Sequence, residues 1–220
     1  MSWYSKIVWS EGMFLRPQHF QQQDRHIEAL VRQSCAYLRP YDWGVGELTL
    51  DREALALGKV AITSAKGLLP DGTPFNIPDY DPPPAPLDID ADVRGVRIML
   101  ALPLRRTGMA DVERGEIQDT AARYRATARE VRDNNFDTAN NSAFVEIGEQ
   151  RLRLFLDTKD FSEHTCIGIV RVLEKRPDQM VVLDGDYLPP SLDCRNQPTL
   201  NGFVTEVLGC KAYVRYMDDF

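Results

Sequence analysis

The sequence predicts a mainly β protein: an antiparallel β-sandwich with an N-terminal arm and amphipathic helix, and a second helix at the C-terminal end. Near both ends of the chain, apolar residues recur every three to four positions, which is helical spacing. Between these ends, roughly six to nine short segments alternate apolar and polar residues and are separated by turn residues. Because no helical pattern interleaves these segments, an antiparallel sandwich is favoured over an α/β fold.

Residues 9–24 are the stretch around which the rest of the chain is organised. Gly12 permits a bend, the apolar run Met13–Leu15 needs a surface to lie on, and Pro17 suits the first turn of a helix. One face of the expected helix is apolar, through Phe20, Ile27, Val31 and Leu38. This pattern is typical of an attachment element rather than a catalytic loop.

The strongest strand signals lie in the middle of the chain. Residues 95–104 are almost continuously apolar, which predicts a central strand buried on both faces. Residues 122–129 alternate small or aromatic residues with Arg123, Arg125 and Arg129, whose side chains are expected on the solvated face. Further strands are expected at residues 48–50, 60–62, 143–147, 152–156, 166–173 and 180–183.

Three connections between strands are also predicted. Gly58–Lys59 is expected to join two strands directly, and Pro70-Asp71-Gly72 is a turn signature because Gly supplies positive φ. Residues 79–92 contain three consecutive prolines and are expected to form an exposed, stiff loop. This loop is either a partner-binding element or a plain connection.

The predicted domains are residues 1–40, an arm and amphipathic helix packing on the sandwich; residues 41–190, the β-sandwich; and residues 191–220, the start of a helical region. The last of these has Pro198 near its start and Thr199 as a candidate cap. Its apolar stripe either docks on the sandwich or pairs with other subunits or with a further C-terminal part. The stripe consists of Leu200, Phe203, Val204, Val207 and Leu208.

Composition excludes several function classes. The net charge of −7, without a cluster of basic residues, argues against nucleic-acid binding. Neither a run long enough to cross a membrane nor a secretory signal is found, so a cytoplasmic location is expected. The four cysteines are widely scattered and are expected to be small buried residues rather than a disulfide framework or a zinc site.

No constellation of residues indicates an enzyme, a cofactor or a metal site. Asp88, Asp90 and Asp92 have the spacing of calcium ligands, but the glycine and the glutamate that such a loop needs are absent. His19 and His26 are too far apart along the helix for a ligand pair. His164 and Cys166 would share one face of a strand, but no third group is placed to orient them.

The run from Trp9 to Asp24 resembles the N-terminus of the TssK family (also called ImpJ or VasE), a baseplate component of the bacterial type VI secretion system. Further likenesses occur at Leu69–Gly72, Leu100–Pro103 and Tyr187–Pro190. Family members are longer, so the chain resembles their N-terminal half. The residues that carry the resemblance are Trp9, Glu11, Gly12, Met13, Leu15, Pro17, Gln18, His19, Phe20 and Gln21–Asp24.

The resemblance implies a structural adaptor that forms a homotrimer, with a sandwich like the shoulder domain of siphophage receptor-binding proteins. In that family, this part docks on the wedge formed by TssF and TssG. The C-terminal part reaches the membrane complex of TssL and TssM, so the baseplate lies at the inner membrane.

On this interpretation the arm carries the protein-binding residues, because buried aromatic and Met side chains contribute most to interface energy. They are Trp9, Met13, Phe14, Leu15, Pro17, His19 and Phe20. A carbohydrate- or ligand-binding sandwich is the alternative, and it would need aromatic residues clustered on one face. A hydrolase on a sandwich fold would need a catalytic constellation.

Overall fold

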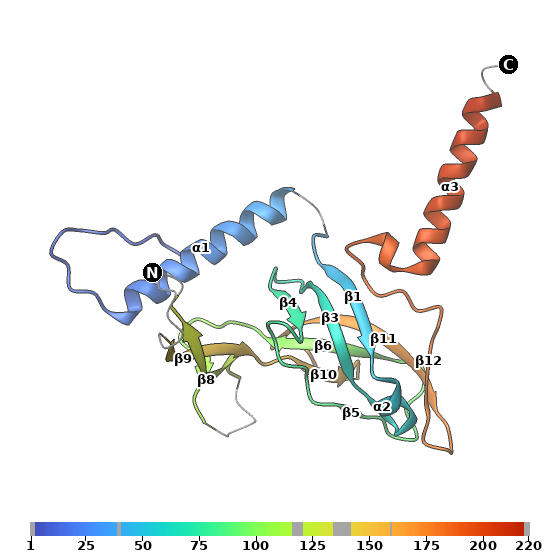
Figure 1. Cartoon of the computed structure of the whole chain (residues 1–220), viewed down its shortest axis with the longest axis horizontal. Helices are drawn as coiled ribbons and strands as arrows, with labels where there is room; N and C mark the ends of the chain where they lie inside the picture. Colours follow the sequence, from blue (N-terminus) through green and yellow to red (C-terminus); the bar gives the residue numbers. More distant parts are fainter. Residues whose placement is uncertain (1–2, 39–40, 116–120, 134–141, 159, 218–220) are drawn as a thin grey trace. The chain divides into compact units, whose positions relative to one another are not determined.

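The structure is a computed structural model, and it divides into two compact units. Residues 1–42 form the arm–helix unit and residues 43–220 form the sandwich unit (Figure 1). The described parts of the chain are residues 3–38, 41–115, 121–133, 142–158 and 160–217.

Strands dominate the sandwich unit, and helices lie near both ends of the chain, as predicted. The helices are α1 (Pro17–Leu38), α2 (Arg52–Ala56), the 3-10 turn η1 (Cys194–Asn196) and α3 (Pro198–Met217). The strands are β1 (Gly44–Leu50), β2 (Lys59–Val60), β3 (Ile62–Leu68), β4 (Pro74–Ile77), β5 (Leu87–Asp88), β6 (Val96–Pro103), β7 (Val112–Glu113), β8 (Tyr124–Arg132), β9 (Ser142–Gln150), β10 (Arg153–Leu156), β11 (His164–Lys175) and β12 (Val181–Leu183).

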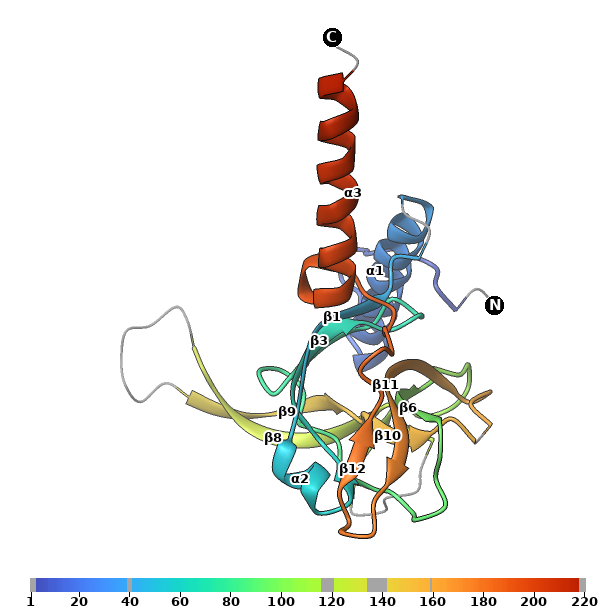
Figure 2. The ribbon, with the colours of Figure 1, turned by 90° about the vertical axis from the view of Figure 1, so that its right-hand side faces the viewer.

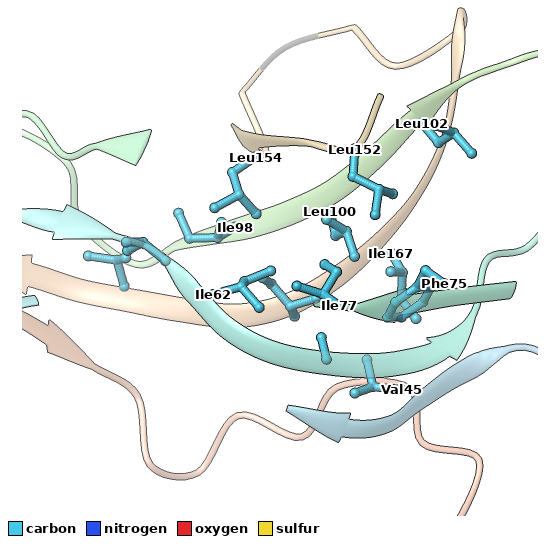
Figure 3. Close-up of a cluster of buried hydrophobic side chains, with 14 of the residues drawn as sticks. Val45, Ile62, Phe75, Ile77, Ile98, Leu100, Leu102, Leu152, Leu154 and Ile167 are labelled. Atoms are coloured by element: carbon cyan, nitrogen blue, oxygen red, sulfur yellow. The ribbon is translucent and has the colours of Figure 1, made fainter. Parts of the chain in front are cut away.

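Two sheets enclose the hydrophobic core of the sandwich unit. One has the order β1-β3-β4 and the other the order β10-β6-β11-β12, and neighbouring strands in both are antiparallel. Figure 3 shows side chains from both sheets pointing into one layer, among them Val45 and Phe75 on one side and Leu100 and Ile167 on the other. The predicted antiparallel sandwich is therefore confirmed.

Strand β6 is the centre of the second sheet, as its apolar sequence predicts. It pairs with β10 on one edge and β11 on the other, and residues 98–103 are buried. Leu100 and Leu102 are completely buried in the core. A strand with paired edges and both faces covered has no polar surface to present, which explains why residues 96–103 carry almost no alternation.

The connections are partly as predicted. The turn at Gly72, with φ of 80°, closes the β3–β4 hairpin, and the Leu69 N–H donates to Thr73 O at 2.9 Å. The prediction that Gly58–Lys59 simply joins two strands is wrong, because the short helix α2 intervenes. Asp51 caps it by accepting from the Glu53 N–H at 2.8 Å. A helix this short is specified by its cap, since it is too short for apolar periodicity to reveal it.

The exposed loop predicted at residues 79–92 is found only in part, because most of its residues are exposed but some are buried. Asp81 and Ile89 are buried, and β5 pairs with β2. The Asp81 carboxylate accepts from the Asn76 N–H at 2.9 Å, and burial raises the pKa of Asp81. The polar anchor and the buried Ile89 hold this segment on the sandwich.

Strands β8 and β9 form a long antiparallel ribbon that extends away from the two packed sheets (Figure 2). Arg125 and Arg129 are exposed on it, as predicted. Arg123, predicted to be solvated, is instead 4% exposed. Its guanidinium donates to Pro103 O at 2.7 Å and to Asp71 Oδ2 at 2.8 Å, and it also contacts Thr73.

A second buried arginine lies beside Arg123 at the base of the ribbon. The Arg151 N–H donates to Arg123 O at 3.0 Å, and the Arg151 guanidinium pairs with Glu113 at 2.8 Å. Buried charges are costly unless they are paired. Both arginines are therefore paired despite their burial. Arg123 holds the ribbon to the β3–β4 turn and to β6, and Arg151 holds it to β7.

Helix α3 begins at Pro198, where the sequence predicts it. The segment before it is held to β1, because the Val45 N–H donates to Pro190 O at 2.7 Å and Asn196 Nδ2 donates to Gly46 O at 2.6 Å. Phe203 and Leu208 are exposed, so within the described residues the first of the predicted alternatives, docking of this stripe on the sandwich, is not found. None of the described helices is long and apolar enough to cross a membrane.

The prediction of buried cysteines is wrong for Cys35, which is exposed on α1. Cys166 and Cys194 are partly buried, and all three are free thiols. The side chain of Cys210 lies outside the described part of the structure.

Candidate protein-binding arm

The arm is a loop that begins beside α1, runs outward, bends back and enters the helix at Pro17. In Figure 1 residues 3–16 lead outward and return to the start of α1. Gly12 supplies the bend with φ of 74°, and the Met13 N–H donates to Ser10 O at 3.3 Å. Positive φ is readily available to glycine but strained for other residues, so the bend depends on Gly12.

His19 closes the first turn of α1. With Pro17 as the first helical residue, Arg16 is the cap and His19 is the third residue of the helix. The Arg16 N–H donates to His19 Nδ1 at 3.0 Å, and the His19 N–H donates to Arg16 O at 3.0 Å. In a capping box a glutamate or glutamine at this position accepts from the cap N–H, so the imidazole takes over that role.

The beginning of the arm lies on the polar face of α1. Gln22 Nε2 donates to Ser5 O at 2.7 Å and to Trp3 O at 3.2 Å. The Arg25 guanidinium lies 4.3 Å from the centroid of the Trp3 ring, which is cation–π geometry. The His26 ring nitrogen is 3.0 Å from Tyr4 O. Contacts from side chains of α1 to backbone carbonyls of the arm, together with the Trp3–Arg25 contact, therefore hold the arm against α1.

The apolar face of α1 is left uncovered. Gln22, Arg25 and His26 lie on the side of the helix opposite to the predicted apolar stripe, given 100° of rotation per residue. Ala29, on the same side as the arm contacts, is the buried residue of the helix. The stripe residues Phe20, Ile27, Val31 and Leu38 are all exposed.

The predicted binding residues differ in how far they are exposed. Trp9, Leu15, Pro17 and Phe20 are exposed, and Phe14 is the most exposed large side chain among them at 83%. Met13 and His19 are partly buried. The structure brings Trp9 and His19 together, with ring centroids 6.3 Å apart.

Several residues of this surface were not predicted. Val8 and Leu30 are also exposed, and they extend the apolar surface of the arm and the helix. The role of Trp3 was missed as well. The sequence did contain a signal for it: the aromatic pair Trp3-Tyr4 precedes a helix in which Arg25 and Arg32 are two turns apart. In the structure, the Arg32 guanidinium lies 5.7 Å from the Tyr4 ring centroid.

The surroundings of His164 and Cys166 work against an activated thiol. Burial raises the pKa of the Cys166 thiol and lowers the pKa of the His164 imidazole, so thiolate formation is disfavoured. Asp88 pairs with Lys59 at 3.0 Å. Within the described ranges, no three His, Cys, Asp or Glu side chains gather to hold a metal ion.

An exposed apolar surface on an arm and a helix, in a chain that also has a β-sandwich, is typical of the structural components of protein assemblies. The chain belongs to the family described as "Bacterial Type VI secretion, VC_A0110, EvfL, ImpJ, VasE", which matches residues 19–212. It is 50% identical over 210 residues to the type VI secretion system baseplate component TssK1 of Pseudomonas aeruginosa. That match covers 95% of this chain and 47% of the relative. The resemblance to TssK is thereby confirmed.

Solved structures agree with this assignment. A crystal structure of TssK superposes with a TM-score of 0.86 and 40% sequence identity, over 93% of this chain and 46% of that one. A chain of a TssK–TssF–TssG baseplate subcomplex, solved by cryo-electron microscopy, has a TM-score of 0.82 at 23% identity and shows the same fold, over 94% of this chain and 68% of that chain. The chain spans about half the length of the TssK1 relative, 47% of it.

Proposed function

We propose that the chain is a structural adaptor of a type VI secretion baseplate and that it docks on the TssF/TssG wedge through the arm–helix unit. The observation that carries this proposal is the apolar surface left exposed on that unit. Phe14, Leu15 and the stripe of α1 present it while the arm covers the polar face of the helix. The subcomplex in which a TssK chain of the same fold assembles with TssF and TssG supports the choice of partner.

The physical argument for docking is that this surface is preorganised. Ordering a flexible loop on binding costs conformational entropy, which subtracts from the affinity. The His19 cap, the Gln22 hydrogen bonds and the Trp3–Arg25 contact order the arm before any partner is present. The exposed aromatic and aliphatic side chains can then be buried by the partner at lower entropic cost.

The same proposal covers the remaining assembly. The chain acts by binding rather than by catalysis, and it forms a homotrimer to which the exposed apolar residues Phe203 and Leu208 of α3 contribute. A part of the protein beyond these residues links the baseplate to the TssL/TssM membrane complex. The assembled protein is accordingly cytoplasmic and associated with the inner-membrane-anchored baseplate.

The docking proposal is tested by light scattering of the chain alone and mixed with TssF and TssG. We expect a complex with the unchanged chain and loss of that complex with the double variant Phe14→Ala/Leu15→Ala. Each truncation removes an apolar anchor, which costs about 2 kcal/mol, or roughly thirtyfold in Kd.

Matched controls come from the sandwich unit. Phe144 on β9 is 79% exposed, close to the value for Phe14, and Leu57 is similarly exposed. The double variant Phe144→Ala/Leu57→Ala should keep the complex. Full binding by Phe14→Ala/Leu15→Ala, or equal loss in both double variants, would contradict docking through the arm.

A further inference from the structure

A groove of about 720 Å³ lies on the sandwich unit, and none of the residues that line it belongs to the set assigned to docking above. It is lined by the proline-rich segment 82–87 and by residues 149–155, which include β10. Arg125 of β8 also lines the groove. Its volume is in the range of protein sites that enclose a ligand or a short chain segment.

Strand β10 offers backbone hydrogen-bonding groups in this groove. It is the outermost strand in the order β10-β6-β11-β12, so only one of its edges is paired within the described residues. The proline-rich segment of the lining contains Pro82, Pro83, Pro84 and Pro86, which have no N–H to donate. Because these prolines cannot donate to the carbonyl groups of β10, the edge of β10 is available to an incoming strand.

The charge in the groove favours an acidic occupant. Arg125 is exposed and forms no ion pair with the described residues, and the arginines that line the groove outnumber its one carboxylate, Glu149. Glu149 lies opposite Arg125 in the β8–β9 ladder, but its carboxylate already accepts from Arg129 at 2.7 Å. The groove is thus locally positive on a chain whose net charge is −7.

Gln150 provides a further observation at the same place. Its Nε2 donates to Pro74 O at 2.9 Å, while its buried Oε1 has no hydrogen-bond partner among the described residues. A buried acceptor without a partner costs free energy, and a donor from a bound chain removes that cost. Gln150 is one of the residues that line the groove.

From these observations we propose that the groove binds an extended, acidic segment of a partner protein, which adds as a strand to the open edge of β10. Backbone pairing along β10 supplies the affinity, and Arg125 selects acidic side chains. The four residues of β10 provide an edge of about 13 Å at roughly 3.3 Å per residue, so the recognised segment is short.

The test uses the full chain and three fluorescent peptides of about ten residues, in which Glu alternates with Thr, Val or Tyr as in a strand. We expect at least one peptide to bind, and its affinity to fall as salt screens the charges. Peptides with Lys in place of Glu, or with alternate backbone nitrogens methylated, should not bind. Arg125→Gln should weaken binding about fivefold, whereas Arg94→Gln, an exposed arginine outside the groove, should leave it unchanged.

The peptide measurements test the groove independently of docking through the arm. Phe14→Ala/Leu15→Ala should bind the peptides as the unchanged chain does, so failure of the docking proposal does not affect this one. Three results would overturn it: no binding by any acidic peptide, equal binding by the methylated peptides, or equal losses in Arg125→Gln and Arg94→Gln. If the groove instead holds a second copy of the chain, Arg125→Gln changes the mass measured by light scattering and the peptides do not bind.

Discussion

At the scale of single residues, His19 makes two contacts that the sequence alone does not reveal. Its Nδ1 accepts from the Arg16 N–H, and its ring lies against Trp9. Both contacts fix the direction in which the arm enters α1. His19 is therefore a positioning residue, and the neighbouring exposed side chains Phe14 and Leu15 are the ones available to a partner.

This role predicts different effects for two substitutions. His19→Ala removes the acceptor of the Arg16 N–H and should destabilise the first turn of α1 by about 1 kcal/mol, the usual value for a lost cap. His19→Gln should restore the turn, because glutamine accepts from the cap N–H in a capping box. Hydrogen exchange at the amides of Gln21–Asp24 measures the effect, with faster exchange expected only in His19→Ala.

The same pair of variants distinguishes positioning from direct contact. If His19 acts through the cap, His19→Gln binds TssF/TssG as the unchanged chain does. Equal loss of binding in both variants, with normal exchange in His19→Gln, would mean that the imidazole itself contacts the partner.

At the scale of elements, the β8–β9 ribbon depends on the two arginines at its base. A two-stranded ribbon is marginally stable by itself. Arg123 joins the ribbon to the β3–β4 turn and to the end of β6, and Arg151 joins it to β7. The ribbon is therefore held by buried ion pairs rather than by apolar burial, as the exposure of Val131, Phe144 and Val145 also indicates.

Removing one of these charges should be costly. Arg123→Met leaves the largely buried Asp71 carboxylate without its partner, which should lower the free energy of unfolding by about 3 kcal/mol. Adding Asp71→Asn should restore part of the loss, because it removes the charge and keeps the acceptor for the Thr73 N–H. Arg114→Gln, which breaks an exposed ion pair with Glu146, should change stability by no more than about 0.5 kcal/mol.

Urea unfolding followed by circular dichroism measures these differences. Equal effects of Arg123→Met and Arg114→Gln would show that the buried pairs do not hold the ribbon.

How far the sequence predicts an element depends on how local its determinants are. The start of α1 at Pro17, the turn at Gly72 and the buried strand β6 were predicted, because each is specified within a few residues. The environment of Arg123 was not, since its partner Asp71 lies 52 positions away and only the fold brings them together. Alternation alone placed Arg123 on a solvated face.

The candidate site shows the same limit. The exposed apolar residues of the arm were recognised as a group from composition and spacing. The contact of Trp3 with Arg25 was not, because an irregular loop has no periodicity that would indicate which face of the helix it covers. The order of strands in the two sheets also could not be derived, since several orders bury the same residues.

At the scale of the whole molecule, the two units are stabilised by different interactions. The arm–helix unit relies on hydrogen bonds and cation–π contacts along the polar face of α1. The sandwich unit has a continuous apolar core between two sheets (Figure 3). A change of pH alters the stability of the sandwich unit through a few partly buried ionisable side chains. Their pKa shifts have opposite effects on the free energy of unfolding as the pH falls.

His164 should dominate the mildly acidic range. Burial lowers the pKa of its imidazole, and the positive charge of Arg153 acts in the same direction. The unfolded chain therefore binds more protons than the folded chain once the pH falls below about 6.5, so stability decreases from there downward. His164→Phe keeps an aromatic ring beside Phe155 and removes the titration. Urea unfolding at about pH 7 and about pH 5.5 should show a smaller loss for His164→Phe than for the unchanged chain.

Carboxylates extend this argument to lower pH and provide its control. The hydrogen bond from Arg129 lowers the pKa of Glu149, so the stability it contributes above the unfolded pKa of about 4.3 is lost only as the pH falls through the folded value. Asp81 acts in the opposite direction, because burial raises its pKa and the folded chain takes up this proton first. Asp81→Asn should therefore lose more stability on acidification than the unchanged chain.

If His164→Phe and the unchanged chain lose the same stability between about pH 7 and about pH 5.5, a group other than His164 controls the acid response of the sandwich.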